Sequence, residues 1–106
     1  MSWLLLVLAG FAEVAWAVGL KYTAGFTRLV PSVFTLATMV LSVYLLSLAL
    51  RSLPLGTAYA IWVGIGAIGT AIAGVFLFEE AATPLKLVSL TLVVAGIVGL
   101  KLASDV

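Results

Sequence analysis

One acidic residue lies in the middle of an apolar run. Between residues 3 and 20 the only charged side chain is that of Glu13. A carboxyl group among apolar groups is costly, and inside a membrane-spanning segment it is by default a functional candidate. Such a group can hold a proton or a cation, because either one neutralises a charge that its surroundings solvate poorly. Glu13 is therefore predicted to exchange protons for a cation; the competing interpretation is a protonated side chain in a structural hydrogen bond.

Helical spacing places small and aromatic residues beside this carboxyl group. Residues three and four positions from Glu13 share its face, and these include Gly10 and Trp16. Small residues let a second helix come close, whereas the tryptophan offers a π face and one N–H donor. This face resembles the wall of a cation site. Trp16 as simple apolar filler remains the alternative.

Later segments contain further candidates. Tyr59 and Trp62 share one helical face, and Ser42 lies with two threonines in the segment before them. The aromatic pair could also be anchors at the membrane boundary. A hydroxyl within a membrane often bonds only its own backbone, so Ser42 by itself is weak evidence.

The composition excludes several classes of function. Hydrophobic residues make up 65% of the 106 residues and charged residues 8%, where a soluble domain carries about 25%. The chain has no cysteine and no histidine, which excludes disulfides, thiolate or imidazole metal sites and Ser-His or Cys-His catalysis. A net charge of +1 gives no reason to expect a nucleic-acid partner. We expect no enzyme activity, cofactor or metal.

Four apolar stretches predict an all-α integral membrane protein, with residues 1–106 forming one four-helix transmembrane domain. Each stretch is close to the roughly 20 residues that cross a bilayer as a helix. Each proline lies near an expected helix start, where its missing N–H costs little. Thr83 is a suitable N-cap for the last helix. The expected helices are 3–20, 31–50, 54–78 and 84–103.

Positive charges barely specify an orientation in the membrane. With four spans, both termini lie on one side, and lysine and arginine counts normally decide which side that is. Here the counts nearly balance. A weak bias could still give one topology; the sharper interpretation is dual topology, with half of the copies inverted. One side carries Arg51, Lys101 and the amino terminus, and the other carries Lys21, Arg28 and Lys86.

Two glycine patterns concern helix packing. Residues 64–69 match GxGxxG, but a dinucleotide fingerprint must join a strand to a helix, and this copy lies inside a long apolar run. We reject a nucleotide site and expect these glycines to permit close helix contact or a bend.

The last helix carries a stripe of small residues suited to helix association, which we call the small-residue stripe. Four short helices are too few to enclose a site and alternate its exposure, so the stripe predicts a dimer contact. Packing within one chain is the alternative. The stripe consists of Ala95, Gly96, Gly99 and Ala103.

Three segments together resemble the small multidrug resistance family of proton-coupled exporters. The similarity runs over nearly the whole chain. The segments are 10–13 (Gly-Phe-Ala-Glu), 21–22 (Lys-Tyr) followed by 25–32 (Gly-Phe-Thr-Arg-Leu-Val-Pro-Ser), and 54–62 (Pro-Leu-Gly-Thr-Ala-Tyr-Ala-Ile-Trp).

This resemblance implies an antiparallel homodimer of four-helix subunits in the cell inner membrane, with both copies of Glu13 in one shared site. It also implies that Glu13 binds substrate and proton. Gly10, Trp16, Ser42, Tyr59 and Trp62 would support the pocket around it, with Tyr59 as the gating hydroxyl.

The segment from Glu13 to Ala17, together with Lys101, is more similar to the guanidinium-exporting subtype. The expected function is a guanidinium/proton antiporter that works by alternating access. Its partners would be a small organic cation, protons, the bilayer and a second copy of the chain. The alternatives are a broad multidrug exporter of quaternary ammonium and hydrophobic cations, and a structural membrane subunit that transports nothing.

Overall fold

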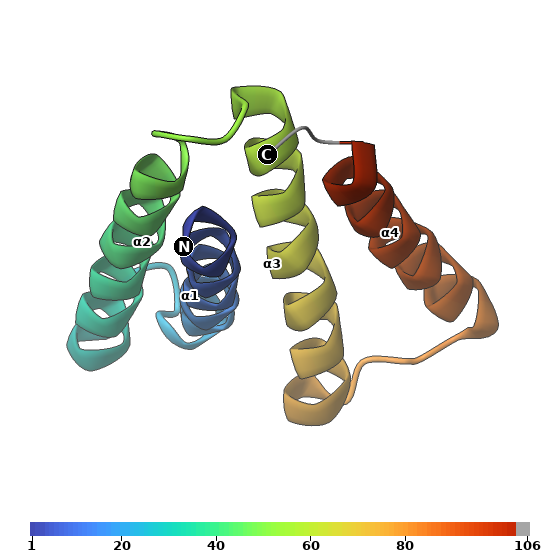
Figure 1. Ribbon diagram of the computed structural model, residues 1–106. Helices are drawn as coiled ribbons and strands as arrows, with labels where there is room; N and C mark the ends of the chain where they lie inside the picture. The colour runs from blue at the N-terminus through green and yellow to red at the C-terminus, as the bar shows by residue number, and fades with distance from the viewer. Residues whose placement is uncertain (104–106) are drawn as a thin grey trace.

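The computed structural model describes residues 1–103 and contains four long helices (Figure 1). Their bounds differ from the expected ones by at most two residues. Each helix has a mean hydropathy of 2.0 or 2.1, and each is long and apolar enough to cross a membrane. The fold is therefore all-helical and fits a protein with four membrane spans. The helices are α1 (Ser2–Tyr22), α2 (Leu29–Ala49), α3 (Leu55–Phe78) and α4 (Pro84–Ala103).

Local side-chain bonds define several helix ends. The Thr23 hydroxyl donates to the carbonyl of Leu20 at 2.8 Å and accepts the amide of Phe26 at 3.2 Å, so it closes α1 and starts the following turn. At the start of α4 the Thr83 hydroxyl accepts the amide of Lys86 at 3.2 Å. This bond confirms the predicted N-cap, which supplies an acceptor to an otherwise free helical N–H.

Helices α1, α2 and α3 form a packed group, which we call the three-helix unit. Helix α1 contacts both α2 and α3, whereas α4 packs along α3; α4 also reaches α1, where the ammonium of Lys101 lies 5.0 Å from the ring centroid of Trp3. In Figure 1, α4 stands apart from α1 and α2 on the far side of α3. No residue of α4 is buried. The buried hydrophobic residues belong to the three-helix unit and the turn after α2: Leu6, Ala9, Leu46, Ala49, Leu53, Ala58, Ile61 and Trp62.

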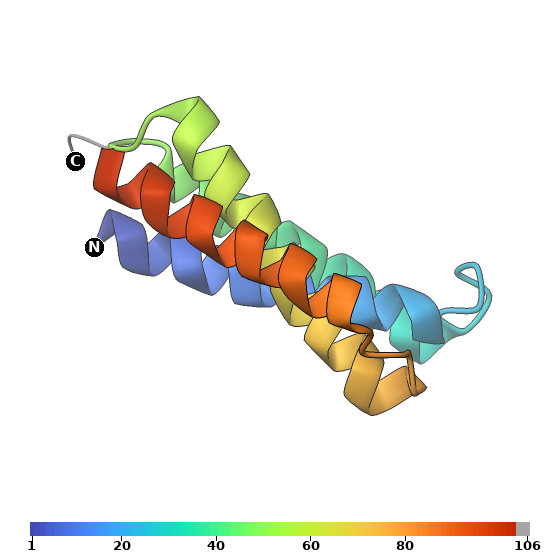
Figure 2. The same cartoon turned by 90° about the vertical axis from the view of Figure 1, so that its right-hand side faces the viewer.

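The connections alternate between the two ends of the molecule. Figure 2 shows the start of α1, the end of α4 and the α2–α3 link at one end, and the α1–α2 and α3–α4 links at the other. Consecutive helices therefore run antiparallel, as short links require.

The glycines of the GxGxxG stretch permit close helix contact. A Cβ at Gly64 would collide with Ile97 of α4, and a Cβ at Gly69 would overlap Val14 of α1. Helix α3 runs unbroken through the stretch. The contact interpretation is therefore confirmed, and no nucleotide-binding turn is present here.

Candidate cation-binding site

Glu13 lies half-buried on α1 with its carboxyl group against α3. The group rests on Gly66, where even a single Cβ would overlap it. Its Oε1 atom is buried and has no hydrogen-bond partner in the part of the chain that the structure describes. A buried acceptor left unbonded costs free energy, so such groups call for an explanation. A carboxyl oxygen without a protein partner is available to a proton or to a bound cation.

One turn before Glu13, three helices are joined at a single carbonyl oxygen. The Ser42 hydroxyl of α2 donates to the carbonyl of Ala9 at 2.7 Å. The indole N–H of Trp62 from α3 lies 3.2 Å from the same carbonyl and 3.0 Å from the Ser42 oxygen. All of these bonds are buried. Because the carbonyl of residue i−4 accepts the amide of residue i in an α-helix, this oxygen also belongs to the turn that carries Glu13. The Ala9 network therefore fixes that turn against α2 and α3.

The aromatic residues occupy different surroundings. Tyr59 lies beside Trp62 with ring centroids 5.5 Å apart, but it is 53% exposed. Trp16 is half-buried, and its indole N–H has no acceptor among residues 1–103. Gly10 is buried, and a Cβ there would press on Ile65 of α3. The structure thus brings Ser42, Trp62 and Tyr59 together, and Gly10 sets how closely α1 approaches α3.

The small-residue stripe of α4 is uncovered. Ala95, Gly96, Gly99 and Ala103 are all exposed, and a Cβ at either glycine would meet nothing within 4 Å. Packing of the stripe within the chain is therefore absent from the described structure. The dimer contact stays a prediction.

Sequence reasoning missed two parts of this site. Gly66 lies in a stretch that the sequence marked only for helix packing, although its position within GxGxxG was a signal of close approach. The Ala9 carbonyl is a main-chain atom, which no residue type announces. Both became visible only when the register between α1 and α3 was known.

The fold and site together define a multi-pass membrane protein with a half-buried carboxyl group whose Oε1 atom has no hydrogen-bond partner among residues 1–103. A model of the Small Multidrug Resistance protein family matches residues 1–93. The chain belongs to this family, which confirms the resemblance noted from its sequence.

Several relatives align over almost their whole length. A protein of Citrobacter freundii named guanidinium exporter is 60% identical over 104 residues, covering 98% of this chain and 99% of the relative. Guanidinium exporters of Salmonella typhimurium strain LT2 and Escherichia coli K12 are 61% and 60% identical with the same coverage. With four apolar helices and these relatives, the chain is a multi-pass transporter of the bacterial inner membrane.

Proposed function

We propose that this protein is a proton-coupled antiporter that exports guanidinium. The observation that carries the proposal is the unpartnered Glu13 carboxyl oxygen, buried against Gly66 in a chain 60% identical to named guanidinium exporters. Membership of an exporter family supports transport rather than catalysis.

Guanidinium suits a carboxyl site of this kind. The ion is planar, permanently charged and weakly hydrated, so it loses less on leaving water than a compact ammonium ion does. It can also bond both oxygens of a carboxylate at once. A proton competes for the same oxygens, and Glu13 cannot hold both ligands at full strength. Protons that enter from one side therefore release the guanidinium that entered from the other.

The neighbouring residues have distinct proposed roles. Ser42 and Trp62 hold the backbone turn of Glu13 through the Ala9 network. Trp16, with a buried and unbonded N–H, narrows the slot or stacks on the planar ion. Tyr59 is the gating hydroxyl, and its exposure on the subunit surface allows contact with a second copy.

The proposed working unit is an antiparallel homodimer with dual topology. Three observations support it: the near balance of positive charge between the two ends, the absence of buried residues on α4, and the uncovered small-residue stripe. A tag at the C-terminus should be accessible from both sides of the membrane. A single orientation for every copy would contradict this part of the proposal.

The decisive experiment is exchange in proteoliposomes with an imposed pH gradient. We expect the wild type to move guanidinium against protons, and Glu13→Gln, which keeps the shape but removes the charge, to abolish exchange. Guanidinium affinity should fall as pH falls, because protons then occupy the site. A preference for quaternary ammonium ions would identify a broad multidrug exporter instead. No transport by the wild type, or transport unaffected by Glu13→Gln, would contradict the proposal.

A further inference from the structure

A cavity begins one turn beyond Glu13 along the α1–α3 contact and extends toward the end of the molecule that carries the α3–α4 link. Its volume is about 440 Å³, and its walls include Ala17 and Lys21 from α1 and Thr70 and Gly74 from α3. Ala17 follows Glu13 by four residues, which is one turn along the same face.

On α3, three residues along this contact are spaced four apart. The Glu13 carboxyl group lies against Gly66, Thr70 lies one turn beyond it, and Gly74 lies one turn further. At 1.5 Å per residue the row spans about 12 Å. The cavity is therefore a path along one helix–helix groove that begins one turn from the central carboxyl group.

A second carboxyl group closes the outer end of this path. Beyond α3 the chain turns back, and the amide of Glu80 donates to the carbonyl of Gly74 at 3.2 Å. The Glu80 carboxyl group then lies against Gly74, where a Cβ would overlap it. Glu80 thus rests on one glycine of α3 as Glu13 rests on another, two turns apart.

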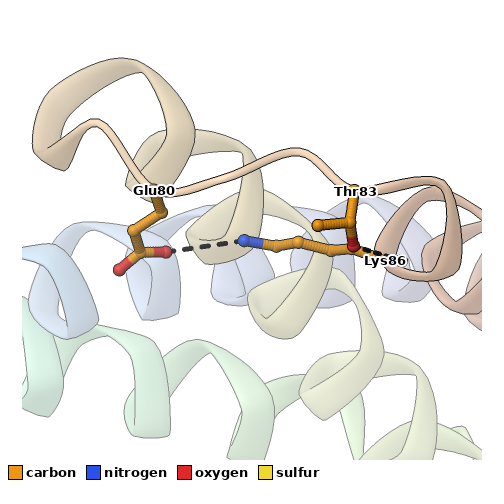
Figure 3. A network of polar contacts seen from close by, with 3 residues as sticks. All are labelled: Glu80, Thr83 and Lys86. Atoms are coloured by element: carbon orange, nitrogen blue, oxygen red, sulfur yellow. Dashed lines mark hydrogen bonds and ion pairs between the residues drawn. The ribbon is translucent and has the colours of Figure 1, made fainter.

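This outer carboxyl group is already paired with a cation of the chain. The ammonium of Lys86 lies 3.6 Å from Oε1 of Glu80, and both side chains are partly exposed, at 29% and 48%. Figure 3 shows Lys86 reaching from the start of α4 to Glu80 on the link. The backbone amide of Lys86 donates to the Thr83 hydroxyl, so the base of the side chain is held in place while its ammonium can move on a flexible stem.

Two other polar groups line the path. The Thr70 hydroxyl oxygen is buried and has no hydrogen-bond partner in residues 1–103, which leaves an acceptor midway between the two carboxyl groups. The ammonium of Lys21 lies 5.2 Å from the ring centroid of Phe78. That contact with a π face holds the second positive charge of the cavity at the wall.

We propose that Glu80 is an outer binding site for guanidinium cations and that Lys86 is its tethered competitor. The proposal rests on the proposed function. An arriving guanidinium bonds both oxygens of Glu80, which the point charge of an ammonium does less well. Lys86 then turns outward into water on its flexible stem. One cation replaces another, so the charge within the cavity is unchanged, and the Thr70 hydroxyl offers the next contact on the way to Glu13.

Initial exchange rates in proteoliposomes test the outer site. Glu80→Gln should raise the KM for guanidinium about threefold and leave kcat near the wild-type value. The increase is small because a partly exposed ion pair contributes little to binding, and kcat is kept because Glu80 binds the ion before the exchange step at Glu13. Lys86→Met should lower the KM by a similar factor, because the competitor is gone. Glu79→Gln is the matched control: it removes an exposed neighbouring carboxyl group outside the cavity and should change neither constant.

Direct binding separates this proposal from the proposed function. With Glu13→Gln, which should not transport, weak guanidinium binding should remain and should disappear in the double variant with Glu80→Gln. Equal effects of Glu80→Gln and Glu79→Gln on KM, or no difference in binding between the single and double variants, would overturn the outer site while leaving Glu13 as the exchanger. Lower activity in Lys86→Met and Lys21→Met with no effect of Glu80→Gln would also overturn it, and would identify the cavity as a site for an anionic headgroup.

Discussion

The helices of the three-helix unit and α4 have nearly the same length and hydropathy, yet they differ in how much of their surface is buried within the chain. The unit contains every buried residue of the helices, the Ala9 network and the two glycine-to-α1 contacts around Glu13. Helix α4 packs against α3, reaches α1 through the contact of Lys101 with the Trp3 ring, and buries none of its residues. Hydropathy alone cannot distinguish them, because lipid and a protein core are equally apolar.

The difference shows which parts of the chain determine the site within one copy. Polar bonds between helices occur where α1, α2 and α3 meet, whereas the hydroxyls of α4 bond their own helix, as in Ser89 to Leu85 at 2.8 Å. In lipid, small residues and interhelical hydrogen bonds hold helices together. The three-helix unit has both small residues and hydrogen bonds at its helix contacts, whereas the small-residue stripe of α4 faces outward without such contacts in the described residues. Four substitutions test this contrast.

The largest effect should come from Gly66→Ala. The new methyl group would overlap the Glu13 carboxyl group and displace it, and a misplacement of about 1 Å can cost about 100-fold in rate. Guanidinium exchange in proteoliposomes measures this loss. Gly56→Ala is the control, since a Cβ there meets nothing within 4 Å and exchange should stay near the wild-type rate. Equal rates in the two variants would mean that the Glu13 carboxyl group does not need its place on Gly66.

The second effect concerns α4. Gly99→Leu should weaken association of two copies about tenfold, because a large side chain separates helices that small residues let approach. Energy transfer between labelled subunits in lipid measures it. The free energy of unfolding of a single copy should not fall, since a Cβ at this position meets nothing within 4 Å in the described residues and glycine is the less favourable residue inside a helix. If the variant associates as tightly as the wild type does, the small-residue stripe is not part of the dimer contact.

A smaller effect is expected at Ser42. Ser42→Ala removes the donor to Ala9 and one acceptor of Trp62, and should lower the free energy of unfolding by about 1 kcal/mol. Ser89→Ala on α4 removes only a bond within its own helix and should change stability by less than about 0.5 kcal/mol. Unfolding in mixed micelles compares the two. A larger loss in Ser89→Ala would reverse the contrast between the unit and α4.

The smallest effect should appear in the link between the two regions. Glu79 follows α3 in the left-handed conformation with φ 55°, which costs a residue with a Cβ more than it costs glycine. Glu79→Gly should raise the free energy of unfolding by about 0.5 kcal/mol, after the greater entropy of glycine in the unfolded chain is subtracted. Glu79→Ala, which keeps the strain, should bring no gain. Equal stability of both variants would show that the turn is not strained.

The sequence predicted the helices well because length and hydropathy decide membrane spans directly. It also identified Glu13, since an isolated charge in an apolar run stands out in any register. It left Gly66 and the Ala9 carbonyl unrecognised, because both act through the packing of α1 on α3. Residue type alone could not show which hydroxyls bond between helices. Ser42 bonds the carbonyl of another helix, whereas Thr38 bonds the carbonyl of Phe34 in its own helix at 2.9 Å. Only the relative rotation of the helices distinguishes them.

The acceptor at the centre of the Ala9 network is a backbone oxygen, and this affects how the site can change. A peptide carbonyl is present whatever side chain residue 9 carries, so no codon change deletes it. This acceptor is thus protected from substitution, and variation can act only on the two side-chain donors that reach it or on the size of residue 9, which is fully buried. Related chains can therefore vary the side chains around Glu13 while this backbone acceptor still holds the turn that carries the carboxyl group.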